Sequence, residues 1–235
     1  MVADAPTVSV VIPAFNAEKY LAEAIDSVLK QTVPVTEIVV VDDGSTDRTA
    51  DIVRAYGEPV RYYHQSNHGV GHACNRGASL AGGEFLGFQA ADDLWAAEKL
   101  ERQLDAFARR PDLDFVFAHV QQFVSPELSD AERASVHCPE QPMAGYLAAA
   151  MLVRRAAFER VGPLATHVGV GDFIDWYDRA RSLGLKEVVL PEILLKRRIH
   201  TTNLSLRHGG GRAEFARVLK GVLDRKRRAA KPSVE

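Results

Sequence analysis

Three pairs of residues with chemically useful side chains follow runs of apolar residues that predict buried strands. The pairs and the strands before them are Phe15-Asn16 after residues 8–12, Asp42-Asp43 after 38–41, and Asp92-Asp93 after 84–88. In an open parallel sheet, ligands bind in the crevice outside the carboxyl ends of the strands. We therefore expect these side chains to converge on one edge of the sheet and to form a ligand site there. Taken singly, each acidic pair also fits a tight turn, where Asp is common.

The adjacent carboxylates of Asp92 and Asp93 predict a site for a hard divalent cation. Two neighbouring acidic side chains repel a phosphate unless a cation lies between them. Mg²⁺ and Mn²⁺ prefer oxygen ligands, and they combine one or two carboxylates with diphosphate oxygens. The alternative is an acidic turn in which Asp93 caps the helix that follows.

Asp43 and Phe15 indicate a site for a nucleobase. A carboxylate at a strand end can accept the imide N3–H of uracil or thymine, whereas cytosine presents an acceptor at that position. The ring of Phe15 on the same edge would stack on the face of the base. UDP is the favoured nucleotide, while dTDP and GDP stay open because thymine and guanine also carry a ring N–H. The alternative for residues 42–45 is a tight turn that leads into a helix.

Two glycine-rich segments resemble common phosphate-binding motifs but do not complete them. In residues 69–74, Cys74 occupies the third glycine position of a dinucleotide-binding fingerprint, and no glycine turn follows the first predicted strand. In residues 77–84, Gly83-Glu84 stands where a P-loop needs Lys followed by Ser or Thr. The negative charge of a bound phosphate must therefore be neutralised by other groups, which favours the cation site.

Strands that alternate with helices predict an α/β fold. Each predicted strand is a continuous apolar run, which is typical of a mostly parallel sheet covered by helices on both faces. The predicted strands are residues 8–12, 38–41, 60–63, 84–88 and 115–117, and the predicted helices are about 17–29, 47–56, 71–80, 100–108, 173–183 and 215–223. Asn16 is the expected N-cap of the first helix. Residues 121–145 carry three prolines and little periodicity, and they predict a long loop.

The composition of the 235 residues is that of an ordinary globular protein, with 46% hydrophobic and 26% charged residues. This excludes the collagen-like, disordered and disulfide-scaffold classes. A net charge of −2 disfavours a nucleic-acid partner. We expect a cytoplasmic location, because the two cysteines are isolated and the sequence shows neither a signal-peptide pattern nor an apolar run that could span a membrane.

The C-terminal end differs in charge from the rest. Residues 207–235 contain nine Lys or Arg against three Asp or Glu, a net charge of +6, which leaves −8 on residues 1–206. The spacing of apolar residues in 215–223 predicts an amphipathic helix with a basic flank. We expect this tail to make peripheral contact with an anionic membrane surface. The alternative is an amphipathic helix exposed to solvent.

Together these segments resemble the inverting family 2 glycosyltransferases, which have the GT-A fold. The matching segments are residues 8–16, 38–47, 75–77 with 83–85, 91–95 and 197–205. The resemblance implies that a sugar is transferred from a nucleotide-diphosphate donor to the hydroxyl of a sugar or lipid-linked acceptor, in polysaccharide or glycoconjugate synthesis. It also implies a GT-A domain of residues 1–205, with a donor-binding half (1–95) and an acceptor-binding half (96–205), followed by the tail (206–235).

The resemblance implies roles for individual residues. Those expected to hold the nucleotide are Pro13, Ala14, Phe15, Asn16, Asp43, Asn75 and Asp92. Those expected to hold Mn²⁺ or Mg²⁺ are Asp92, Asp93 and His200. Asp172 is the expected base for the acceptor hydroxyl, with Asp175 as a rival, and Trp176 is expected to pack on the acceptor sugar.

Three positions depart from the family pattern. Ala90 and Cys74 stand where Asp and Arg are frequent, and the late Glu-Asp pair of the family falls on Asp172-Phe173. These departures keep open a catalytically silent protein that binds nucleotide sugars. A sugar nucleotidyltransferase is another alternative. It would need a basic, glycine-rich loop after the first strand, where this chain has Pro-Ala-Phe-Asn at 13–16.

Overall fold

The computed structural model describes residues 5–166, 171–204 and 220. In this part of the chain the strands form one sheet of order β3-β2-β1-β4-β8-β6-β9-β5, and β7 pairs with β6. The strands are β1 Val8–Ala14, β2 Glu37–Asp42, β3 Val60–His64, β4 Phe85–Phe88, β5 Leu94–Trp95, β6 Phe115–Val124, β7 Met143–Ala144, β8 Leu152–Arg154 and β9 Glu187–Ile199. The helices are α1 Leu21–Leu29, α2 Thr49–Arg54, α3 Val70–Leu80, α4 Lys99–Arg109, α5 Asp130–Ser135, α6 Arg155–Val161 and α7 Asp172–Ser182, with a 3₁₀ turn at Ala148–Ala150.

The first four long strands build the parallel half of the sheet. β1 lies between β2 and β4, and β3 pairs with β2, all in parallel. β8 then enters antiparallel between β4 and β6, while β6 and β9 pair in parallel. The predicted α/β fold with a mostly parallel sheet is therefore confirmed.

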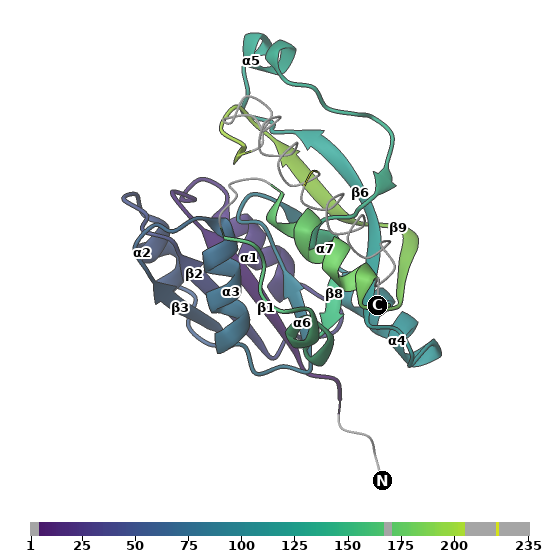
Figure 1. Ribbon diagram of the computed structural model, residues 1–235. Helices are drawn as coiled ribbons and strands as arrows, with labels where there is room; N and C mark the ends of the chain where they lie inside the picture. The colour runs from purple at the N-terminus through teal and green to yellow at the C-terminus, as the bar shows by residue number, and fades with distance from the viewer. Residues whose placement is uncertain (1–4, 167–170, 205–219, 221–235) are drawn as a thin grey trace.

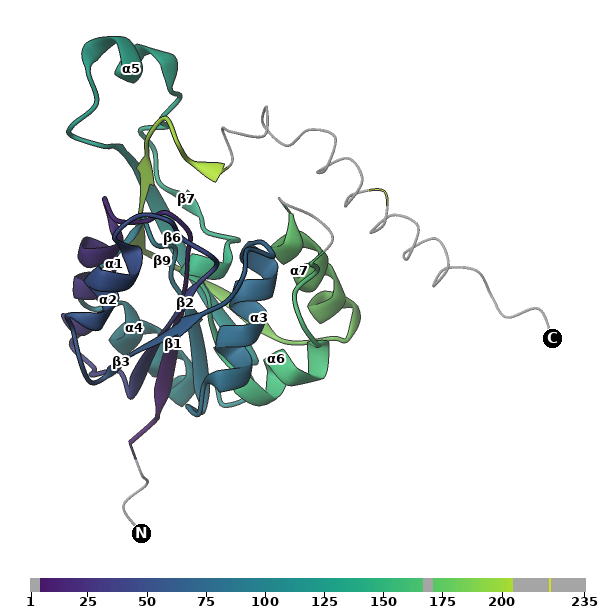
Figure 2. The same cartoon turned by 90° about the vertical axis from the view of Figure 1, so that its left-hand side faces the viewer.

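Helices cover both faces of this sheet. α1 and α4 lie on one face, and α3, α6 and α7 lie on the other (Figures 1 and 2). Leu21 and Ile25 of α1 share a buried cluster with Leu100 of α4, because apolar residues recur at helical spacing on the side that faces the sheet. On the opposite face, Trp176 of α7 packs with Phe115 of β6.

Helix α3 lies unusually close to the sheet. A Cβ atom on Gly77 would come within 2.2 Å of Cγ1 of Val11 in β1, so only glycine permits this approach. The close contact places the first turns of α3 beside the carboxyl ends of β1 and β2. Residues of α3 therefore help to shape the edge where the site was predicted.

The second half of the chain is more regular than the sequence predicts. β6 continues to Val124, and α5 follows, with a capping box in which Ser129 and Glu132 bond each other's backbone N–H. The expected long loop at 121–145 is therefore only partly correct. Pro191 obscures β9 in the sequence, and the strand accommodates it beside register shifts opposite β6.

Two further predictions concern the start of the first helix and the C-terminal tail. α1 begins at Leu21 with Tyr20 before it, so the prediction that Asn16 caps this helix is wrong. The predicted helix 215–223, and with it the membrane contact of the tail, lies outside the described residues except for Lys220. No helix in the described part of the chain has both the length and the hydrophobicity needed to cross a bilayer.

Candidate functional site

Phe15 and Asp43 lie where β1 and β2 end, as predicted. The backbone N–H of Asp43 donates to the carbonyl of Ala14 at 2.8 Å, which joins the two strand ends. The Phe15 ring is 44% exposed, whereas Asp43 is only 4% exposed. An exposed ring beside a nearly buried carboxylate is an arrangement that can stack on a base and accept its N–H.

Asn16 connects two loops at this edge. Its backbone has a φ of 48°, in the left-handed region that Asn tolerates. Its Oδ1 accepts the N–H of Thr46 at 2.8 Å, and its own N–H donates to Oγ of Ser45 at 2.9 Å. In the described structure Asn16 therefore braces the loops that follow β1 and β2.

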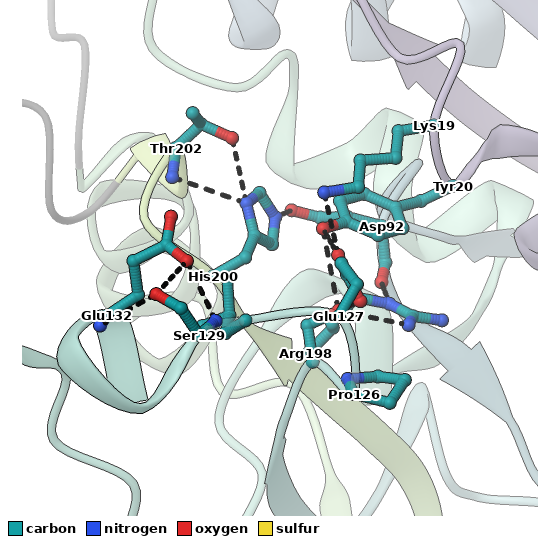
Figure 3. A network of polar contacts seen from close by, with 12 residues as sticks. Lys19, Tyr20, Asp92, Pro126, Glu127, Ser129, Glu132, Arg198, His200 and Thr202 are labelled. Carbon is teal, nitrogen blue, oxygen red and sulfur yellow. Dashed lines mark hydrogen bonds and ion pairs between the residues drawn. The ribbon is translucent and has the colours of Figure 1, made fainter. Parts of the chain in front are cut away.

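Asp92 and His200 meet at the same edge from opposite halves of the chain. Nε2 of His200 lies 3.0 Å from Oδ2 of Asp92, and Nδ2 of Asn203 donates to that oxygen at 3.1 Å. Figure 3 shows the His200 imidazole directed at the Asp92 carboxylate. His200 is 6% exposed, so its ring is held in a largely desolvated position.

The His200 ring is fixed on more than one side. Its Nδ1 lies 2.8 Å from Oγ1 of Thr202, and the ring centroid is 4.8 Å from that of Tyr20. One neutral tautomer donates Nε2–H to Asp92. The other donates Nδ1–H to Thr202 and leaves Nε2 with a lone pair for a cation. The backbone N–H of Thr202 also donates to Nδ1 at 3.3 Å, so the described contacts match the tautomer with Nε2–H, and binding a cation through Nε2 requires the other tautomer.

Asp93 is joined to strand β9. Its side chain is 5% exposed, and Oδ1 accepts the backbone N–H of Arg198 at 2.9 Å. Burial, with the neighbouring Asp92 charge as a second cause, raises the pKa of Asp93 to about 8. One oxygen of Asp93 is thus engaged with β9, and its predicted part in holding the cation stays a prediction.

Arg198 holds the backbone of the Asp92-Asp93 pair in place. Its Nε donates to the carbonyl oxygen of Asp92 at 3.0 Å, and Nη2 pairs with Glu23 of α1 at 2.7 Å. The guanidinium also lies over the rings of Tyr20 and Phe123, at 4.6 and 4.9 Å from their centroids. Arg198 and Asn203 belong to the segment that resembles the family, but the sequence did not single them out.

Asp92 and His200 fit a divalent cation whose other ligands come from the bound substrate. Within residues 5–166 and 171–204, no group of three or more His, Cys, Asp or Glu is arranged to hold a metal ion. Asp92 supplies one carboxylate, and His200 supplies one imidazole nitrogen beside it. Mg²⁺ and Mn²⁺ sites in phosphate-transferring proteins use such sparse protein ligation, since diphosphate oxygens provide other ligands.

Asp172 opens helix α7 at the other side of this edge. Its Oδ1 accepts the N–H of Phe173 at 2.8 Å, and burial raises the pKa of its carboxyl. Burial also raises the pKa of the Cys74 thiol, with further contributions from the charges of Asp172 and Asp43. Cys74 is therefore close enough to both carboxylates for their charges to act on its thiol.

Asp175, the rival base, is engaged elsewhere. Its carboxylate pairs with Nε of Arg179 at 3.0 Å, one turn further along α7. Arg179 also donates to the carbonyls of Val161 and Pro163. The structure thus gives Asp175 a place in an ion pair that ties α7 to the end of α6.

Two further predicted site residues take structural roles. Trp176 is fully buried between Phe158 and Phe173, and its Nε1–H donates to Gly162 at 3.0 Å. Its predicted contact with an acceptor sugar is wrong, because its ring is part of the core. The side chain of Asn75 donates to the carbonyl of Leu164 and accepts its N–H, at 2.9 and 2.8 Å. Asn75 therefore anchors the segment before α7, and the expectation that it holds the nucleotide is not supported.

Solved glycosyltransferase structures share this mostly parallel sheet with helices on both faces, which is the GT-A fold. The model of the family described as Glycosyl transferase family 2 matches residues 9–162. The chain belongs to this family. It is 30% identical to an uncharacterised glycosyltransferase of Rickettsia typhi over 218 residues, which cover 86% of this chain and 67% of that protein.

Solved structures share the fold at lower identity. The complex of S. aureus TarS 1–349 with UDP-GlcNAc has a TM-score of 0.67 at 23% identity and covers 85% of this chain. The mannosyltransferase PcManGT of Pyrobaculum calidifontis, in complex with GDP-Man and Mn²⁺, has a TM-score of 0.70 at 21% identity and covers 94% of it. This chain spans 60% and 65% of those two chains.

Proposed function

We propose that this protein is an inverting glycosyltransferase that moves a sugar from a nucleotide-diphosphate donor to the hydroxyl of a sugar or lipid-linked acceptor. The observation that carries the proposal is the pairing of Asp92 with His200 at the edge of the sheet. The folds of TarS and PcManGT, described with UDP-GlcNAc and with GDP-Man and Mn²⁺, support the assignment of donor class and cation.

In this proposal each part of the edge has one task. Phe15 and Asp43 bind the nucleobase, while Asp92 and His200 would hold Mg²⁺ or Mn²⁺. The cation, when bound, supplies Lewis-acid stabilisation to the leaving diphosphate. Arg198 and Asn203 keep the Asp92 carboxylate aligned through its carbonyl and its Oδ2.

Asp172 is the proposed base. An inverting displacement requires a group that takes the acceptor proton as the hydroxyl attacks the anomeric carbon from the side opposite the diphosphate. Burial raises the pKa of Asp172, which makes its carboxylate a better proton acceptor than an exposed Asp. Asp175 is the weaker choice because it is paired with Arg179.

The test compares the two carboxylates of the doublet. In a thermal-shift titration with UDP and GDP, Mn²⁺ is expected to raise the melting temperature of the wild type further than nucleotide alone. Asp92→Asn should abolish the Mn²⁺-dependent part. Asp93→Asn should keep it, since the amide oxygen can still accept the N–H of Arg198.

An equal Mn²⁺ effect in both variants would contradict the assignment of Asp92. Nucleotide binding without donor hydrolysis or transfer to any acceptor would favour the catalytically silent alternative.

A further inference from the structure

The carboxylate of Asp43 already accepts three hydrogen bonds from the turn that precedes α3. Oδ1 accepts from Nε2 of Gln65 at 2.7 Å and from the N–H of His68 at 3.0 Å. Oδ2 accepts from the N–H of Gly69 at 2.7 Å. An ionised carboxylate offers about four acceptor positions, so one remains, on Oδ2.

The turn itself is firmly positioned against β2. The N–H of Gln65 donates to the carbonyl of Asp42 at 2.9 Å. Gly69 has a φ of 93°, and a Cβ on Gly44 would lie 2.9 Å from the backbone nitrogen of Asn67. The bonds to Asp43 therefore come from a segment that packs tightly against the loop holding it.

We propose that Gln65, by occupying Oδ1 of Asp43, makes the donor site selective for a base with a single imide N–H, uracil or thymine, over guanine. This inference rests on the proposed function, because it requires a nucleotide at this edge of the sheet. It assigns a specificity-determining role to a residue that has no part in the predicted chemistry.

The selectivity follows from counting donors. Uracil and thymine present one N–H, at N3, between two carbonyl acceptors, and one free position on Oδ2 satisfies it. Guanine presents two adjacent donors, N1–H and the N2 amino group, which a carboxylate with both oxygens free would bind together. Asp43 is nearly buried, so the unmatched donor of guanine would lose its water without gaining a partner. Such a loss weakens binding by roughly 10- to 100-fold.

The experiment measures the affinities of UDP, dTDP and GDP by calorimetry with Mn²⁺ present. Three proteins are compared, namely the wild type, Gln65→Met and Ser66→Ala. Methionine keeps the length of the side chain and removes the donor, which frees a second position on Asp43. Ser66 lies in the same turn, but its hydroxyl bonds the ring of His68, so Ser66→Ala is the matched control.

We expect the wild type and Ser66→Ala to prefer UDP and dTDP over GDP by about tenfold or more. Gln65→Met should narrow this ratio toward one. Equal affinities of the wild type for UDP and GDP would overturn the inference, and so would an unchanged ratio in Gln65→Met. If no nucleotide binds with or without Mn²⁺, the proposed function itself fails. That outcome is distinct from binding without selectivity.

Discussion

Asp172 is the residue whose removal should separate binding from transfer. Asp172→Asn keeps the size of the side chain and the acceptor for the N–H of Phe173, so the fold and the nucleobase side should persist. It removes the proposed base, which lowers the turnover number by about 10²- to 10⁴-fold. The measurement is steady-state transfer alongside calorimetric UDP affinity, which should stay unchanged.

Asp175→Asn is the matched control for this substitution. It also replaces an acidic residue in the first turn of α7, but its main consequence is the loss of the ion pair with Arg179. We expect a small loss of thermal stability and turnover within a few-fold of the wild type. The assignment is wrong if Asp175→Asn loses transfer while Asp172→Asn retains it.

Asp92 and Asp93 show how much of a single residue's role could be predicted from the sequence. Their position after a strand was enough to predict a site for a cation. The sequence could not separate Asp92 from Asp93, because their orientations depend on His200 and Arg198, more than 100 positions away in the chain. Trp176 was misassigned for a related reason, since an aromatic residue at helical spacing fits either a core or a sugar platform.

At the scale of elements, α3 positions the start of α7. A Cβ on Gly71 would lie 2.5 Å from the carbonyl oxygen of Ala165 and 3.6 Å from Oδ2 of Asp172. Gly71→Ala should therefore displace the segment that Asn75 anchors and cost about 1–3 kcal/mol of stability. We expect turnover to fall by about tenfold or more, because small misplacements of a catalytic group are costly. The measurement is turnover together with urea unfolding.

Gly82→Ala controls for the change of residue type. Gly82 follows α3, and the nearest atom to an added Cβ is Oε1 of Glu37 at 3.7 Å, an ordinary contact. This variant should match the wild type within about 0.5 kcal/mol. If both variants lose the same stability and activity, close packing at Gly71 is not the cause.

Helix α4 begins with a buried lysine that should appear in the pH dependence of stability. Lys99 is fully buried, its Nζ donates to Gln103 at 2.7 Å, and it lies 3.9 Å from the centroid of Trp95. Burial lowers the pKa of Lys99 well below its ordinary value. Above this lowered pKa and below about 10.4, the unfolded chain binds more protons than the folded one. The contribution of Lys99 to the free energy of unfolding therefore rises with pH.

Lys99→Met should remove this rise. Urea unfolding at several pH values from neutral to alkaline should show the wild type gaining stability relative to the variant as pH increases. Lys30→Met is the control, because Lys30 is exposed directly after α1 and pairs with Asp26 of that helix. Parallel curves for wild type and Lys99→Met would contradict the prediction.

The elements that the sequence predicted best are those whose apolar runs are uninterrupted. β1 and β2 are buried along their whole length or nearly so, and their patterns match the observed strands within two residues. β9 was missed because Pro191 and its basic C-terminal residues do not form an apolar run. Its position depends on pairing with β6, which is a tertiary interaction.

At the scale of the whole molecule, the site is built from both halves of the chain. Phe15, Asp43 and Asp92 follow strands of the parallel half. His200 follows β9, on the far side of β8 and β6 in the sheet order. β5 begins two residues after Asp92 and pairs antiparallel with β9, so the Asp92–His200 contact depends on this pairing of segments that are distant in the chain.

The basic tail and the acidic body carry opposite net charges, and this difference supports a prediction that the protein binds an anionic membrane surface. Residues 207–235 carry a net charge of +6 beside a body of −8, so the tail alone should favour an anionic surface. We expect the full chain to sediment with vesicles rich in anionic lipid at low salt, and progressively less as salt screens the charges.

A variant with four basic residues of the tail replaced by Gln should no longer sediment with the vesicles. The replaced residues are Arg225, Lys226, Arg227 and Arg228. The matched control replaces four exposed basic residues of the body, Lys30, Arg102, Arg109 and Arg110, and should sediment as the wild type does. Equal loss in both variants would mean that net charge, rather than the tail, drives the association.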